Sequence, residues 1–447
     1  MSSITVMVPR RGPALVRAAA VTVSLLVVTW ALRRVPLPSV RTESIPGQAG
    51  AMLRSGLAAL GLEPLLIGFI LVELVSFTPP GRRWRDGGPA GRARLNVAAL
   101  TLSLLLAAIQ AGGLALTLEL MVDRSGAPLV LHPGSAFRLI MVLTLTAATA
   151  SLFALATAIS EWGVGNGFCW LWALQTVEAV VRPWRLESHR PSGAEPTELL
   201  FGALCMLPVV ALAAWVELGD LRLTVSTAAG ETSRLRLPPL PQGILPVGWA
   251  ESSATLVFSL AAGSHSLWLS RLAPLLPVTG RLLLIPAFSL IAYALFSTPR
   301  RLAANLRLNA TVGLAAGLTA QVIRTTAYLT AGSVALYLVH HLIPASPNLA
   351  MTSVVVLTAL VLDLRDEVEF TRRYGKTVRL LQLDNVHLAS YLKALLGAQG
   401  IAVLARAYRF RSLFYFLNPL VKIDVRIAAD RLDAAAALVA AQDLRTL

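Results

Sequence analysis

The stretch Ile159-Ser160-Glu161-Trp162-Gly163-Val164-Gly165-Asn166-Gly167 decides the fold more than any other part of this sequence. One long apolar segment runs up to it and another follows it directly, so the chain must reverse direction within a few residues. Glycine adopts backbone conformations that other residues avoid, and asparagine is common in turns. The stretch therefore predicts a tight turn at the membrane surface between two helices. Taken alone, it fits a simple helix hairpin equally well.

Apolar segments continue on both sides of this turn. Of the 447 residues, 55% are hydrophobic and 14% are charged, whereas soluble domains are about 25% charged. A helix needs roughly 18 or more apolar residues to cross a bilayer. Such segments predict spans at about 14–32, 57–77, 95–117, 137–160, 166–182, 197–217, 243–263, 280–297, 318–343 and 349–363. The sequence predicts an all-α membrane protein of about ten transmembrane helices and excludes a globular enzyme with one buried core.

Arginines set the orientation of these spans. The formal charge of +15 comes mostly from arginine, which collects in cytoplasmic loops of membrane proteins. The basic loops 78–94 and 298–317 fall on the same side, and an even number of spans places both termini there. We therefore predict that both termini are cytoplasmic and that the protein does not bind nucleic acid directly. The first apolar segment is too long for a signal peptide and is expected to be retained.

The sequence offers no catalytic or metal-binding pattern. Cys169 and Cys205 lie within apolar segments and form no CxxC motif. His340 and His341 have no acidic partner at metal-ligand spacing and are typical of an interfacial pair. There is also no P-loop and no nucleophile elbow. We therefore predict a protein that is not an enzyme, with no metal and no cofactor, whose energy source comes from a partner.

The character of the chain changes after residue 375. Residues 377–383, 401–406 and 421–427 read as strands, and 387–399 reads as a short helix. Asp430 is expected to cap a final alanine-rich helix that ends near residue 441. The sequence thus predicts two domains, a transmembrane domain over 1–375 and a small α+β cytosolic domain with a βαββα order over 376–447.

Several motifs in order carry a family resemblance. The turn resembles the acidic residue and Gly-Ile-Gly-Asn-Gly between the fourth and fifth helices of the SecY protein-conducting channel family. The segments 237–246 with 250–253, and 298–306, resemble two further SecY motifs. The matching residues are Glu161, Gly163, Gly165, Asn166, Gly167, Pro246, Pro299 and Asn305. From residue 14 to about 375 the chain therefore resembles a divergent SecY protein.

This resemblance implies two inverted halves around a central pore. It places an apolar pore ring at Leu62, Leu66, Phe168, Trp172, Gly248 and Val356. It also places a lateral gate between the second and seventh helices, with polar residues Glu63, Glu73, Glu251 and Ser252. Carboxylates at membrane depth are costly, so we expect them to face the pore or the gate. Each ring residue also fits ordinary helix packing, and the expected plug, residues 42–55, also fits an external loop.

The resemblance also implies partners. It predicts SecE-like and SecG-like small membrane subunits, a polypeptide substrate, and a motor ATPase or a ribosome on the cytosolic side. The docking loops, roughly 218–240 and 298–317, hold only scattered arginines such as Arg222 and Arg307. These loops therefore do not match the basic hairpins on which the family's usual motor docks. The tail resembles small signal-transducing domains through residues 388–396; it either replaces or regulates docking, or is a plain folded tail.

Three functions follow from these observations. The first is a SecY-like translocase channel subunit that moves polypeptides across or into the bacterial cytoplasmic (inner) membrane. The alternative is a degenerate paralogue that serves as a membrane scaffold or sensor without conduction. A transporter of small solutes is the third, and it would need polar groups at broken helices near the midplane, whereas the Gly-Asn-Gly turn is expected at a surface.

Overall fold

A computed structural model describes most of the chain. The described residues are 15–41, 56–85, 88–122, 126–187, 196–219, 221–226, 232–237, 240–251, 253, 276–296, 298–299, 312–342, 349–383, 385–414 and 421–441. The expected plug, Ser252, Asn305 and most of the loop 298–317 lie outside them.

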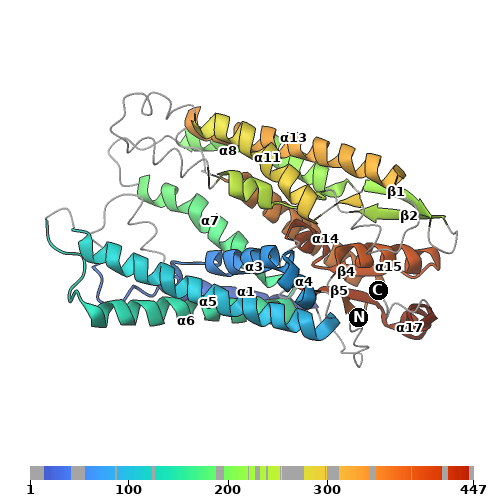
Figure 1. The fold of residues 1–447 in the computed structure, drawn as a ribbon, viewed down its shortest axis with the longest axis horizontal. Helices are drawn as coiled ribbons and strands as arrows, with labels where there is room; N and C mark the ends of the chain where they lie inside the picture. Colours follow the sequence, from blue (N-terminus) through green and yellow to red (C-terminus); the bar gives the residue numbers. More distant parts are fainter. Residues whose placement is uncertain are drawn as a thin grey trace.

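Long helices make up most of the molecule (Figure 1). They are α1 (Leu15–Leu32), α3 (Glu63–Ser76), α4 (Pro79–Arg85), α5 (Gly88–Leu120), α6 (Ser135–Trp162), α7 (Gly167–Glu187), α8 (Pro196–Leu218), α11 (Leu276–Phe296), α13 (Val312–Leu342) and α14 (Met351–Tyr374). A short 3-10 turn, η2 (Gly56–Ala58), precedes α3. Among the described residues, six helical stretches are long and apolar enough to cross a membrane: 15–32, 56–76, 93–120, 135–162, 278–295 and 315–342. The count of ten spans stays a prediction.

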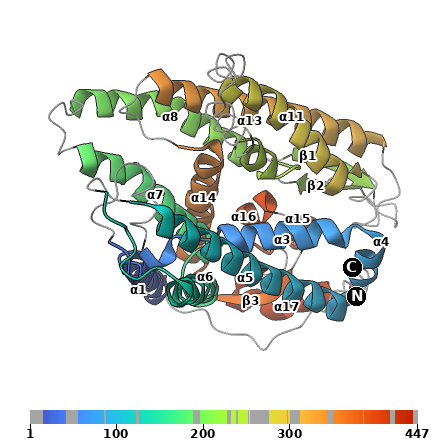
Figure 2. The same cartoon turned by 60° about the vertical axis from the view of Figure 1, so that its left-hand side comes forward.

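The helices form two groups (Figure 2). One group contains α1, α3, α5 and α6, which pack on one another, and the other contains α8, α11 and α13. Helices α7 and α14 lie between the groups and contact each other. Because α7 starts at the Gly-Asn-Gly turn, that turn lies at the junction of the two groups.

Helix α14 differs from its prediction in length. The apolar pattern places its end near residue 363, yet it continues to Tyr374. The additional turns carry Asp363, Asp366 and Glu367, of which Glu367 is buried against the tail. The prediction was wrong because a helix can continue beyond the lipid wherever protein covers its polar residues.

The loop after α8 contains a β-hairpin that the sequence reading missed. Strands β1 (Leu221–Ser226) and β2 (Thr232–Leu237) pair antiparallel, with Leu221 opposite Leu237 and Ser226 opposite Thr232. Leucine and valine alternate with polar residues along β1, which is the period of a strand. That alternation was the available signal, and the arginines within it made the segment look like an irregular basic loop.

The tail contains the predicted strands. Strands β3 (Thr377–Leu383), β4 (Val403–Arg406) and β5 (Ile423–Ala428) form an antiparallel sheet in the order β3-β5-β4. Helix α15 (Val386–Ala398) begins at Asn385, whose side chain accepts a hydrogen bond of 2.9 Å from the amide of His387. Helix α17 (Leu432–Ala441) follows a 3-10 turn, η5 (Ala429–Arg431). Asp430 lies inside that turn, so the predicted cap was wrong.

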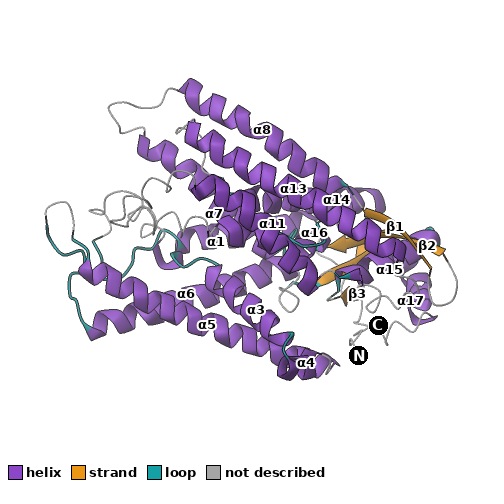
Figure 3. Cartoon of the chain, turned by 45° about the horizontal axis from the view of Figure 1, so that its top comes forward, coloured by secondary structure: helices purple, strands orange, loops and turns teal. Residues whose placement is uncertain are grey.

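A short helix, α16 (Tyr408–Leu413), was not predicted. It belongs to the tail by sequence, but its apolar side chains join the large hydrophobic core formed by the membrane helices. The rest of the tail has a separate hydrophobic core, built from the sheet, α15 and α17. The tail, the β1–β2 hairpin and α4 all lie at one end of the helix groups (Figure 3). The tail therefore does not hang free of the membrane helices.

Candidate functional site

The turn between α6 and α7 has the tight geometry that its sequence predicts. Gly165 has a φ of +71°, a conformation that favours glycine, and its amide donates to Glu367 Oε2 over 3.0 Å. At Gly167, a Cβ atom would lie 1.8 Å from the carbonyl oxygen of Ala156, so only glycine fits there. The turn therefore brings α7 against the end of α6 more closely than any side chain would permit.

Asn166 starts α7. Its buried Oδ1 accepts hydrogen bonds from the amides of Phe168 (2.9 Å) and Cys169 (3.3 Å), which a helix leaves unsatisfied at its first turn. The amide of Gly167 donates to Ser160 Oγ over 2.9 Å. Asn166 is thus a helix cap, which fixes the direction of α7 and the positions of the first side chains after the turn.

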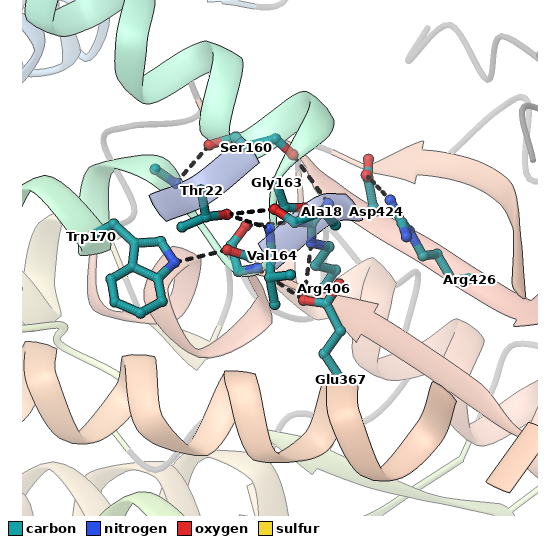
Figure 4. A network of polar contacts seen from close by, with 12 residues as sticks. Ala18, Thr22, Ser160, Gly163, Val164, Trp170, Glu367, Arg406, Asp424 and Arg426 are labelled. Carbon is teal, nitrogen blue, oxygen red and sulfur yellow. Dashed lines mark hydrogen bonds and ion pairs between the residues drawn. The ribbon is translucent and has the colours of Figure 1, made fainter. Parts of the chain in front are cut away.

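Arg406 of the tail completes this turn (Figure 4). Its buried guanidinium donates to the carbonyl oxygens of Ser160 (3.1 Å), Gly163 and Gly165 (2.9 Å). It also forms an ion pair with Glu367 of α14, with 3.2 Å between Nε and Oε2. One tail side chain thereby joins α6, the turn and α14. Sequence analysis missed it because these residues lie far apart along the chain.

Glu161 lies at the edge of this network. Its side chain is exposed and lines a cavity of about 170 Å³ between the turn and the tail. Asn166, Arg406 and Lys422 line the same cavity. The acidic residue of the motif therefore faces solvent at the junction with the tail.

Five of the six predicted ring residues lie in or against the large hydrophobic core of the molecule. Leu62 before α3, Phe168 of α7 and Val356 of α14 are buried in this core. Leu66 and Trp172 are partly buried and pack against it. Gly248 lies next to α14, where an added Cβ atom would be 3.8 Å from Thr352 Oγ1. Val356 follows Thr352 by one helical turn. The core that holds these residues takes side chains from both helix groups, and the pore ring itself stays a prediction.

The predicted gate residues are more dispersed. Glu63 is exposed at the start of α3, and Glu73 is half-buried near the end of that helix. Glu251 accepts hydrogen bonds from Ser333 Oγ (2.8 Å) and from the amide of Met351 (3.1 Å). This carboxylate therefore links the segment after β2 to α13 and caps the start of α14.

The two proline motif residues also have described positions. Pro246 is buried at the start of the helical segment 245–251, and Pro299 is half-buried. Within the described part of the chain, no group of three or more histidine, cysteine, aspartate or glutamate side chains is arranged to hold a metal ion.

Solved structures with the same arrangement of helices define the class of protein. A structure described as "The structure of a protein conducting channel" has a TM-score of 0.54 and 12% identity, and the match covers 81% of this chain and 94% of that chain. Sec61 in the canine ribosome-channel complex from the endoplasmic reticulum also has a TM-score of 0.54 and 12% identity, with 81% and 95% covered. At these identities the likeness shows the fold, which is that of a protein-conducting channel.

The sequence comparison identifies the family. A sequence model of the SecY family matches residues 56–363, and the chain belongs to this family of membrane proteins. The SecY translocase subunit of Escherichia coli K12 is 27% identical over 281 residues, which is 58% of this chain and 63% of that protein. The SecY subunit of Rickettsia typhi is 27% identical over 229 residues, which is 48% of this chain and 53% of that protein. The chain thus aligns with less than two thirds of either relative. The match of the family model confirms the predicted family.

Proposed function

We propose that this chain is the channel subunit of a protein translocase, which moves polypeptides across the membrane or releases them sideways into it. Two relatives named as translocase subunits SecY support this proposal. The observation that carries it is that Leu62, Phe168 and Val356 are buried in the core shared by both helix groups, with Leu66 and Trp172 packed against that core. In this role the protein is a channel and not an enzyme.

The physical task of such a channel explains this cluster. An apolar constriction excludes water and ions when it is empty and closes around a polypeptide when it is occupied. Leu62 and Phe168 are almost completely buried, whereas Leu66 and Trp172 are partly exposed. Partly exposed apolar side chains beside a buried layer suit a surface that exchanges its contacts for those of a passing chain.

The wider architecture of the proposal follows the family. We propose ten spans in two inverted halves, with residues 1–375 as the transmembrane domain and 376–447 as a small α+β cytosolic domain. The arginine-rich α4 lies at the same end of the molecule as the tail, which supports a cytoplasmic assignment for that end. Both termini are then cytoplasmic, and the membrane is the bacterial inner membrane.

Partners complete the proposed complex. SecE-like and SecG-like small membrane subunits would assemble with the helix groups, and a motor ATPase or a ribosome would supply the driving force. The β1–β2 hairpin lies where such a docking loop is expected, and α15 of the tail packs against β2. In this chain a docking partner would therefore meet the tail as well as the hairpin.

The lateral gate is proposed between α3 and the segment that begins at residue 245, with Glu63, Glu73, Glu251 and Ser252 on its two sides. The hydrogen bonds of Glu251 to α13 and α14 hold the second side to its own helix group. Opening would then separate α3 from that side without breaking those bonds.

Site-specific photocrosslinking tests the proposed function. A photoreactive residue replaces Leu66 in the ring, and the matched control replaces Leu105, which is 56% exposed on the outer side of α5. Capture of an arrested secretory chain at residue 66 but not at 105 is the expected result. Absence of capture at both positions, while an orthodox SecY in the same membranes captures the chain, would favour the scaffold alternative.

A further inference from the structure

Helix α16 of the tail is seated among the membrane helices. Phe410, Leu413 and Phe414 are each no more than 2% exposed, and all three belong to the core formed by those helices. The amide of Ile244, at the start of the proposed seventh span, donates to the carbonyl oxygen of Leu413 over 3.0 Å. The tail thus supplies apolar side chains and a backbone hydrogen bond to the region beside the proposed gate.

Phe414 reaches the proposed ring. Its ring centroid lies 5.6 Å from that of Trp172, in a tilted arrangement, and 4.8 Å from that of Phe410. Such aromatic contacts are favourable beyond the area that they bury. An aromatic pair of the tail therefore lies beside the proposed ring, with Phe414 in contact with Trp172.

Two arginines hold α16 in place. Arg406, just before it, binds the turn and Glu367 as described above. Arg409, within it, donates to the carbonyl oxygen of Glu217 in α8 and to Asp366 Oδ2 of α14 over 3.2 Å. Its Nε lies 3.8 Å from Asp363 Oδ1 of α14. The cations are on the tail and the carboxylates are on α14. Attraction between these opposite charges therefore favours the position of α16 against α14.

The segment 406–414 lies where helices of both groups come close to the tail. The segment 406–414 contacts α6, α7, α8 and α14, which come from both helix groups. Figure 2 shows α16 beside α14, in the space between α3 and the β1–β2 hairpin.

Resting on the channel function proposed above, we propose that residues 406–414 close the cytoplasmic mouth and that an incoming apolar polypeptide segment displaces them. Apolar side chains of the substrate would take the place of Phe414 against Trp172. Access then depends on the fraction of molecules in which the mouth segment is released, because a site that is seldom open binds its ligand more weakly by that fraction.

A reversible tether tests this proposal. Ile244→Cys and Leu413→Cys are combined in a chain that carries Cys169→Ala and Cys205→Ala, with the photoreactive residue at Leu66. The hydrogen bond between the two backbones brings the cysteines close together, and a disulfide forms on oxidation where their Cβ atoms face each other. We expect the oxidised protein to capture an arrested secretory chain about tenfold less than the same protein after reduction. Each single-cysteine chain serves as the control for oxidation itself.

A release variant tests the opposite direction. Phe414→Ala with Arg409→Ala removes one aromatic contact and one arginine with its ion pairs. This variant should capture more of the arrested secretory chain than the protein in which residues 406–414 are unchanged. Equal capture by the oxidised and reduced forms would overturn the mouth-closure proposal and leave the channel function intact. If the disulfide does not form, a reducible bismaleimide joins the same two cysteines, and equal capture before and after its cleavage would likewise overturn the mouth-closure proposal. Absence of capture in all forms, with capture by an orthodox SecY alongside, would overturn the channel function itself.

Discussion

The tail contains two regions that are neighbours in sequence and opposite in how they are stabilised. The sheet β3-β5-β4 with α15 and α17 buries its apolar side chains against one another. Helix α16, inserted between β4 and β5, buries Phe410, Leu413 and Phe414 against the membrane helices. The first region carries its own core, whereas the second depends on the rest of the molecule. Because the sheet region has a core of its own, we expect it to stay folded when residues 406–414 are released.

Loss of Arg406 should break the connection between these regions most severely. Arg406→Ala leaves Glu367 buried without its ionic partner, which typically costs about 3–5 kcal/mol. The expected result is release of residues 406–414 from the membrane helices, measured as faster hydrogen exchange there. Arg379→Ala is the control, because Arg379 pairs with Asp424 inside the tail sheet. It should speed exchange in β3 and β5 and leave the Gly163–Gly165 turn protected.

Removal of Phe414 should have the next largest effect. Phe414→Ala deletes a buried aromatic ring and is expected to cost about 3 kcal/mol. The matched variant is Leu396→Ala, at a residue of α15 that is completely buried in the tail core. Limited proteolysis in detergent should cut near residue 414 in the first variant and within α15 in the second. Identical cleavage patterns would show that the two cores are one cooperative unit.

Acid should lower the stability of the tail near His387, where α15 lies close to α16. Burial, and the neighbouring charge of Arg411, lower the pKa of His387 from its ordinary value of 6.5 to about 4. The unfolded tail therefore binds this proton first, so stability is intact above pH 6.5 and falls as the pH drops toward 4. Between pH 7 and pH 5 the loss should be about 2 kcal/mol. In the His387→Gln variant, the melting temperature should change much less between pH 7 and pH 5. If it changed as much as in the unmodified protein, another group would be responsible for the pH dependence.

The smallest effect is expected at the tail surface. Arg431 and Asp430 lie 4.0 Å apart with most of both side chains exposed, and such pairs contribute at most about 1 kcal/mol. Arg431→Ala should leave the melting temperature and the proteolysis pattern unchanged. A large effect would indicate a contact of this surface with a partner or with the membrane.

The same contrast explains what the sequence could predict. The turn at residues 159–167 was predicted because glycine and asparagine act locally, on their own backbone and on the next helix. The strands of the tail were predicted from alternation over a few residues. Arg406, Arg409 and Phe414 were missed because their partners, in α6, α7, α8 and α14, lie far away in sequence. The end of α14 was missed for the same reason. Its last turns carry charged residues, which fit a helix there only because the folded tail covers them.

A photoreactive residue at Trp172 tests the central claim most directly, because Trp172 belongs to the proposed ring and contacts the mouth segment. Without substrate, the account predicts a crosslink within the chain to the tail peptide that contains Phe414. With an arrested secretory chain, that crosslink should fall and capture of the secretory chain should appear in its place. Adducts with lipid alone, unchanged by the secretory chain, would contradict both the polypeptide path and its closure by the tail.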